Sequence, residues 1–199
     1  MKHHFVKKIL EIFLSEGIST YTIQQLAKKV SVSTKTIYLN FKSKDQLLAA
    51  CLELYYEQFL EEIKVIYCTE KSSVTAFLKA TSFILSREFN TNQAFFTDLN
   101  RNFKAIQDAV LNKIHPKFPD SSVEILKNGI AEGTVQSDIK PELFMAAFVR
   151  LYHSITRESA YSTYGYSTPV ILENTIYPLV KGILTEKGLK EYERYISIQ

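Results

Sequence analysis

The chain has 199 residues, of which 46% are hydrophobic, and a formal net charge of +3 at pH 7. This composition excludes a disordered chain, and apolar runs far shorter than the roughly 20 residues that cross a bilayer exclude a membrane-spanning helix. With six glycines, five prolines and no secretory segment at the N-terminus, we expect a cytoplasmic protein built from long helices. Its two cysteines, Cys51 and Cys68, are too few for a disulfide framework and are interpreted as reduced packing residues.

The positive charge is concentrated at the N-terminus. The first 50 residues carry eight lysines against three acidic residues, a net +5, so the remainder carries −2. A basic end on a nearly neutral body is typical of a phosphate-binding module attached to something else. The thirteen phenylalanines and twelve tyrosines must fill a core, line a pocket or form an interface.

The first predicted helix covers about residues 3–16, where apolar side chains recur at helical spacing. It stops at Gly17, a residue favoured just after a helix end. A second, short helix begins after Thr22, which together with Gln25 forms a capping-box signature, and ends near Val30.

A third helix follows after a very short connector, capped by Ser33 and running to about Leu39. Ser43 and Gln46 repeat the capping signature ahead of a long helix over about 44–65. Short helices separated by so short a turn have the spacing of a helix-turn-helix. On spacing alone, an ordinary helical hairpin with no role in DNA binding remains an equal alternative.

The rest of the chain is also predicted to be helical. Pro141 occupies a natural first helical position, and Pro178 should kink or split the last helix. Strand signals are almost absent. The predicted helices lie at about 72–89, 91–114, 121–133, 141–162 and 169–195.

Residues 9–48 read ILEIFLSEGISTYTIQQLAKKVSVSTKTIYLNFKSKDQLL, in which Tyr38, Phe41, Lys44 and Leu47 recur at three-residue spacing. This stretch resembles, without a gap, the DNA-binding domain of the TetR/AcrR family of transcriptional regulators. Two positions depart from the family pattern. Ser31 replaces a glycine in a turn that prefers positive φ, and a lysine stands at position 35, where relatives more often have a small residue.

The resemblance implies an all-α protein in two parts. Residues 1–46 would form the three-helix helix-turn-helix domain, and 47–199 a larger helical domain for ligand sensing and dimerisation. Such a homodimer binds a roughly palindromic double-stranded operator, most often as a repressor released by a small molecule. Its last two long helices would pair with their symmetry mates, through the apolar positions Leu143, Ala147, Leu151 and Ile155 on one and Ile176, Val180, Ile183 and Leu184 on the other.

In a helix-turn-helix the second helix enters the major groove with its N-terminal residues leading. Lys35 could donate to guanine O6 and N7, and Thr34 and Thr36 offer hydroxyls and methyls to base edges. The other polar residues of this region would hold phosphates. The predicted DNA-contacting residues are Thr22, Gln24, Ser33, Thr34, Lys35, Thr36, Tyr38, Asn40, Lys42 and Lys44.

The expected ligand is small and apolar or aromatic, because aromatic residues stand on inward-looking stretches of the C-terminal part. Aromatic residues in such positions are more often plain core than ligand contacts. The candidate ligand-binding residues are Tyr55, Phe83, Phe96, Phe103, Phe148, Tyr152 and His153. As an alternative, the C-terminal part serves protein interaction rather than sensing.

Catalysis is not expected from this sequence. The histidines form no HExxH arrangement, and the chain has neither a GxSxG motif nor a glycine-rich phosphate loop. We therefore expect a protein that is not an enzyme and that uses no cofactor or metal.

Overall fold

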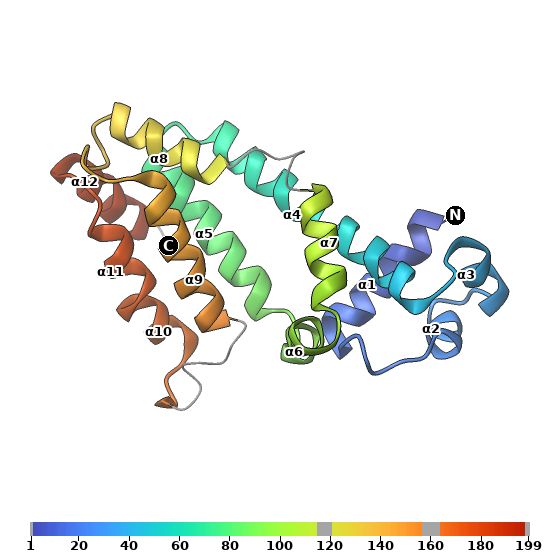
Figure 1. The fold of residues 1–199 in the computed structure, drawn as a ribbon. Coiled ribbons are helices and arrows are strands. Elements are labelled where there is room, and N and C mark those ends of the chain that lie inside the picture. The colour runs from blue at the N-terminus through green and yellow to red at the C-terminus, as the bar shows by residue number, and fades with distance from the viewer. Residues whose placement is uncertain (1, 115–120, 157–163, 198–199) are drawn as a thin grey trace. The chain divides into compact units, whose positions relative to one another are not determined.

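The computed structural model describes residues 2–114, 121–156 and 164–197. Over these residues the fold is helical (Figure 1), and the β-structure amounts to one isolated bridge between Val135 and Leu184, which confirms the all-α expectation. The helices are α1 (Lys2–Glu16), α2 (Ile23–Lys29), α3 (Thr34–Asn40), α4 (Lys44–Thr69), α5 (Ser73–Phe89), α6 (Gln93–Asn102), α7 (Lys104–Ile114), α8 (Ser121–Ala131), α9 (Pro141–Thr156), α10 (Thr168–Asn174), α11 (Ile176–Lys181) and α12 (Glu186–Ile196).

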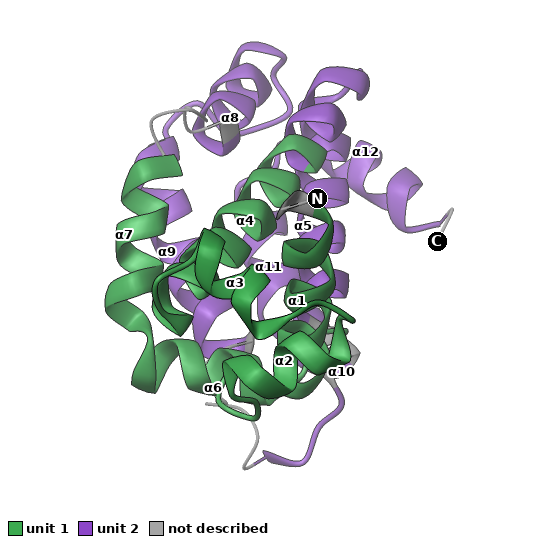
Figure 2. Ribbon diagram, turned by 90° about the vertical axis from the view of Figure 1, so that its right-hand side faces the viewer, with its two compact units in different colours: residues 1–62, 90–119 green, residues 63–89, 120–199 purple. Residues whose placement is uncertain are grey.

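The chain forms two compact units, coloured separately in Figure 2. The first unit comprises Met1–Glu62 and Asn90–Pro119, and the second comprises Ile63–Phe89 and Asp120–Gln199. Helix α4 begins in the first unit and ends in the second. The functional boundary predicted after residue 46 falls within the first unit and stays a prediction.

The core of the first unit unites α1 to α4 with α6 and α7. Phe13, Leu47 and Phe95, from three different helices, are completely buried in it. Asn92, just before α6, fastens that helix to the end of α1: its backbone N–H donates to the Leu14 carbonyl at 2.8 Å, and its side-chain amide donates to the Ser15 carbonyl at 2.9 Å. The three-helix module therefore rests on α6 and α7 as well as on α4.

The second unit is built around aromatic contacts between α5 and α9, where the Phe77 ring centroid lies 5.2 Å from that of Phe148. The segment after α8 is clamped to the segment after α11. The Thr185 N–H donates to the Thr134 carbonyl at 3.0 Å, and the Gln136 N–H donates to the Ile183 carbonyl at 2.9 Å. These bonds fix the start of α12 on the body of the unit.

Two predicted helices are divided in the structure. The one expected over 91–114 breaks at Phe103, which leaves helical geometry at φ −127° and packs its ring against the first unit's core. Since no glycine or proline lies at this break, we attribute it to the packing of Phe103 rather than to backbone preference. The helix expected over 169–195 forms three helices, α10, α11 and α12, with breaks at Thr175 and between Lys181 and Glu186. Pro178 falls in the first turn of α11, where no intrahelical bond needs its N–H.

The apolar positions predicted to form the dimer interface have different surroundings. The predicted interface residues Ile155, Ile176, Val180, Ile183 and Leu184 are buried in the second unit's own core, so their assignment to an interface is wrong. Their spacing is that of any helix face packed on a core, which sequence alone does not distinguish from an interface.

Both cysteines lie on α4 in different environments. Cys51 is buried in the first unit's core, as predicted, and burial raises the pKa of its thiol. Cys68 is exposed in the last turn of the helix, so its interpretation as a packing residue is wrong. Although α4 is long, neither it nor any other described helix has the length and hydropathy needed to span a bilayer.

Ser31, in the turn between α2 and α3, has φ +57°, as expected for a position that favours glycine. We predict that Ser31→Gly raises the free energy of unfolding by up to about 1 kcal/mol, because it removes this backbone strain. Urea denaturation measures the change. Ser167→Gly is the matched control, since Ser167 is exposed at φ −69° and makes no capping bond. Equal changes in the two variants would show that the turn is not strained.

Candidate nucleic-acid interface

Side-chain caps fix the starts of the two short helices α2 and α3. The Thr22 hydroxyl accepts from the Gln25 N–H at 3.3 Å, and the Gln25 side-chain oxygen accepts from the Thr22 N–H at 2.8 Å. At α3, the Ser33 hydroxyl accepts from the Thr36 N–H at 2.9 Å. Both predicted caps are present, and they hold the turn between the helices in one geometry.

The turn brings α2 and α3 together over a shared core. Ala27 is almost completely buried on α2, and its carbonyl accepts from the Val32 N–H at 3.0 Å. Leu26 and Ile37 are completely buried, one on each helix. Because Ile37 points inward, the opposite side of α3 is presented to solvent.

Two residues form the outermost ridge of α3. Lys35 and Leu39 each lie about 200° around the helix axis from Ile37, in opposite senses, and so within about 40° of each other. Both are exposed, and Leu39 has the largest exposed fraction, 76%, of the large apolar side chains that the structure describes. Leu39 was not among the predicted contacts. Its position two residues after Ile37, and therefore on the opposite side of the helix, can be seen in the sequence.

The remaining polar residues of α3 make local contacts. The Asn40 side-chain amide donates to the Thr36 carbonyl at 2.8 Å, and the Thr36 hydroxyl lies 2.7 Å from that of Ser33. Thr34 is half-buried and Tyr38 is exposed. The predicted contacts Thr34, Lys35 and Thr36 therefore share one short helix, with Lys35 reaching furthest from it.

An open hollow of about 550 Å³ adjoins α3. Five of the ten predicted DNA-contacting residues line it, and nine of its ten lining residues carry a hydroxyl, amide or ammonium group that can bind a phosphate oxygen. The other lining residues lie at or within three positions of the predicted caps Thr22 and Ser43, and this proximity is the sequence signal that could have identified them. The lining consists of Ser19, Thr20, Tyr21, Thr22, Ile23, Gln24, Tyr38, Lys42, Ser43 and Lys44.

Lys44 lines the hollow, but its ammonium is bound within the protein. It donates to the carbonyl oxygens of Ile18 and Tyr21 at 2.6 and 2.7 Å. Burial lowers the pKa of Lys44, and the nearby carboxylates Asp98 and Asp45 oppose that shift. Lys44 therefore holds the wall of the hollow in place, and its contact with phosphate stays a prediction.

The same wall is held from α6 by Asp98. Its carboxylate accepts from the Ser19 N–H at 2.7 Å and from the Ser19 hydroxyl at 2.6 Å. The segment between α1 and α2 thus lies between a cation on α4 and an anion on α6. All three elements belong to the first unit.

Lys29 is also engaged within the protein. Its ammonium lies 2.7 Å from a Glu16 oxygen and 4.3 Å from the centre of the Tyr21 ring, whose hydroxyl donates to Glu16. Hydrogen bonds from Lys29, and then from Tyr21, lower the pKa of the Glu16 carboxyl. The charge of Lys29 is therefore paired with Glu16, whereas Lys42, which lines the hollow, and Lys35 on α3 are exposed.

The residues predicted to bind a ligand are divided between the two units. Tyr55, Phe96 and Phe103 contribute to the first unit's core, with the Tyr55 ring centre 5.9 Å from that of Phe95. In the second unit, Phe148 and Tyr152 are buried, and Phe83 and His153 are half-buried. The Tyr152 and His153 rings lie 5.5 Å apart. The ligand-binding role of all seven stays a prediction.

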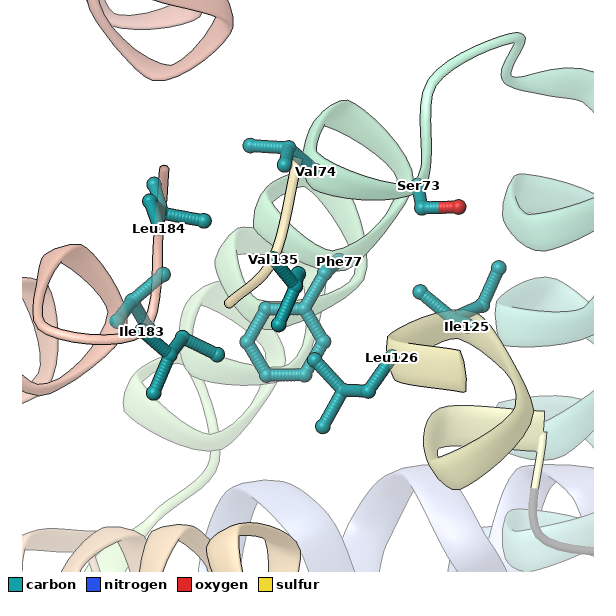
Figure 3. A pocket seen from close by; sticks show the side chains of 9 residues that line it. Ser73, Val74, Phe77, Ile125, Leu126, Val135, Ile183 and Leu184 are labelled. Carbon is teal, nitrogen blue, oxygen red and sulfur yellow. The ribbon is translucent and has the colours of Figure 1, made fainter. Parts of the chain in front are cut away.

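An apolar cavity lies within the second unit, between α5, α8 and α11 (Figure 3). Its volume is about 10 Å³, which is room for one water molecule at most. The seven predicted ligand residues do not line it. Its lining consists of Ser73, Val74, Phe77, Ile125, Leu126, Val135, Val180, Ile183 and Leu184. Within the described ranges, no three His, Cys, Asp or Glu side chains converge as they would around a metal ion.

Capped short helices, a left-handed turn and an outward α3 beside a polar hollow define a DNA-binding protein of the helix-turn-helix class. Residues 5–51 match the family model described as "Bacterial regulatory proteins, tetR family". Residues 5–51 therefore form a DNA-binding domain of the tetR type.

Two curated relatives from Bacillus subtilis (strain 168) match the chain. It is 32% identical over 65 residues to the uncharacterized HTH-type transcriptional regulator YerO, and 30% identical over 74 residues to a second such regulator, YuxN. These matches cover 33% and 37% of this chain but 22% and 25% of the relatives, so the chain spans about a quarter of their length or less.

Solved structures share the fold over nearly the whole chain. The reduced form of Escherichia coli NemR has a TM-score of 0.70 at 17% identity, covering 92% of this chain and 97% of that one. Bacillus subtilis FadR, in complex with stearoyl-CoA, has a TM-score of 0.65 at 17% identity, covering 92% and 100%. A Clostridium perfringens putative fatty acid metabolism regulator has a TM-score of 0.63 at 20% identity, covering 92% and 99%. At such identities the likeness establishes the fold.

Proposed function

We propose that the chain is a cytoplasmic repressor that binds a palindromic operator as a homodimer and is released by a small apolar or aromatic ligand. The observation that carries the DNA-binding part is the exposed Lys35 ridge of α3 beside the polar hollow. Side chains that can contact base edges and side chains that can bind phosphates therefore lie next to each other. A helix that binds in the major groove needs both.

Each predicted contact has a role that its position supports. Lys35 donates to guanine from the outermost ridge, and Thr34 and Thr36 approach base edges beside it. Around the hollow, Gln24, Tyr38 and Lys42 hold the phosphates on either side of the groove. Thr22, Ser33, Asn40 and Lys44 act first through the bonds that hold the helices and the wall of the hollow, and second through contacts with phosphate.

Dimerisation is proposed through the outer side of α9. Leu143 is 71% exposed, Ala147 is exposed and Leu151 is half-buried, and together they form a stripe along the helix. The small Ala147 side chain would let two such helices approach closely. A single helix-turn-helix covers too little DNA for tight specific binding, so a second copy on the other half-site is needed.

Release by a ligand is supported by the fold. A TetR-fold regulator, Bacillus subtilis FadR, was solved with stearoyl-CoA, a ligand with a long apolar chain. In this chain a ligand could change operator affinity only by binding one of two conformations better than the other. A ligand that entered at the cavity between α5, α8 and α11, which holds about 10 Å³, would have to open the core around it.

The small size of that cavity favours one alternative for the C-terminal part, namely protein interaction rather than sensing. This cavity is no preformed small-molecule site, since such pockets usually measure about 300–1,000 Å³. Calorimetric titration with aromatic and acyl compounds, in the presence and absence of operator, distinguishes the two. Heat and operator release with one class of compound support sensing.

To test the function, purified protein is incubated with a randomised DNA pool at two salt concentrations, and the retained DNA is sequenced. We expect a palindrome whose affinity falls steeply as salt rises. A single half-site should bind much more weakly than the full site, as a dimer requires. Lys35→Ala should weaken binding about 5- to 100-fold and relax the preference at its base pair.

Lys104→Ala is the matched control for Lys35→Ala. Lys104 is an exposed lysine of the same unit, paired with Asp108 on α7, and its loss should leave the selected motif unchanged. Retention of DNA without any shared motif would contradict sequence-specific regulation. Equal losses in both variants would mean that Lys35 contributes charge alone.

A further inference from the structure

The sequence-reading surface of α3 includes an apolar residue at its outermost position. Leu39 is 76% exposed and stands one helical turn after Lys35, so the two side chains are neighbours on one face. The side chains around them are directed elsewhere. Ile37 is buried, Tyr38 lines the hollow, and Asn40 is bonded to the Thr36 carbonyl.

The floor of the major groove offers one apolar feature to such a side chain. Adenine, guanine and cytosine present hydrogen-bond donors and acceptors there, whereas thymine also presents its C5-methyl group. An isobutyl group pressed against a polar base edge would leave that edge without its water and without a partner. Against a thymine methyl, both apolar surfaces leave water together.

We propose that Leu39 reads a thymine methyl group in each half-site of the operator. The inference rests on the proposed function, and it adds a specificity-determining residue that makes no hydrogen bond. Lys35 and Leu39 then read neighbouring bases, the lysine selecting guanine and the leucine selecting thymine. Because the helix advances about 6 Å between the two residues, the bases are adjacent or nearly so along the groove.

The test uses the palindrome selected by the wild-type protein. Each thymine is replaced in turn by 2′-deoxyuridine, symmetrically in both half-sites, which removes the methyl group and leaves base pairing intact. At one position, the replacement should weaken wild-type binding about fourfold per half-site, the value of one methyl group. The Leu39→Ala variant should bind thymine and uracil duplexes equally at that position.

Leu111→Ala is the matched control. Leu111 is a leucine of the same unit, on α7 and 36% exposed, and its variant should retain the wild-type response to uracil. Thermal unfolding of both variants checks that neither substitution disturbs the fold.

The outcomes separate this inference from the function on which it rests. In one outcome, the selection enriches a palindrome while uracil substitution changes the affinity of wild type and of Leu39→Ala equally at every position. That result would overturn the role of Leu39 and leave the proposed function standing. Failure to enrich any motif would overturn the proposed function, and the role of Leu39 with it. Leu39→Ala could instead change the oligomeric state of the DNA-free protein, measured as the mass of the assembly, without any uracil effect. That result would show that Leu39 contacts a second chain and would overturn its role in reading thymine.

Discussion

The Gly188→Ala variant is expected to lose about 3 kcal/mol or more of unfolding free energy, because a methyl group has no room at this position. A Cβ atom on Gly188 would lie 2.1 Å from the Thr134 carbonyl oxygen and 3.2 Å from the Leu184 Cβ. The Thr134 oxygen cannot move aside easily, since it accepts the Thr185 N–H in the clamp between the two segments. The start of α12 must therefore move away from the segment after α8, which contains Thr134.

Urea denaturation followed by circular dichroism measures this loss. Gly182→Ala provides the control, because Gly182 has helical geometry, at φ −62° and ψ −17°, and its added Cβ would meet carbonyl oxygens at 3.4 and 3.5 Å, which is ordinary contact. That variant should be neutral or slightly more stable. If both variants kept wild-type stability, the close approach at Gly188 would not exist in solution.

The Lys44→Met variant is expected to lose about 2 kcal/mol of stability, because it leaves the Ile18 and Tyr21 carbonyls without their charged donor. Operator affinity should also fall about tenfold or more, since Thr22 and its neighbours are no longer held in position. Methionine keeps much of the length and apolar stem of lysine, so the loss reports on the ammonium group.

The Lys42→Met variant is the control that distinguishes a lysine that contacts phosphate from Lys44, which holds the protein backbone in position. Lys42 is exposed and lines the same hollow, so its replacement should reduce operator affinity and the salt slope by about one phosphate contact while stability stays unchanged. Denaturant midpoints and binding titrations at several salt concentrations measure both variants. A Lys44→Met protein with wild-type stability and only a reduced salt slope would contradict the positioning role.

Local signals in the sequence were sufficient for the DNA-binding elements. The caps at Thr22 and Ser33 and the strained turn at Ser31 depend on residues within a few positions of one another, and all three are found in the structure. The break at Thr175 could be anticipated for the same reason, because Pro178 acts on the turn that precedes it.

Features that depend on distant residues could not be predicted in this way. The engagement of Lys44 needs the carbonyls of Ile18 and Tyr21, more than 20 residues away in the chain, and Asp98 on α6 adds a further support. The break at Phe103 follows from packing in the first unit. The buried face of α11 has the same periodicity as an interface, so only the packed structure shows which of the two it is.

The course of the chain through the two units bears on how the protein is made. The first unit needs residues from both sides of the insertion Ile63–Phe89, because Phe95 and Leu99 on α6 and Val110 on α7 complete its core. During synthesis, the DNA-binding module therefore leaves the ribosome well before the helices that support it. Until α7 emerges, the apolar face of α1 and α4 is exposed to chaperones and to other nascent chains. Fragments that end after α4 should aggregate rather than bind DNA.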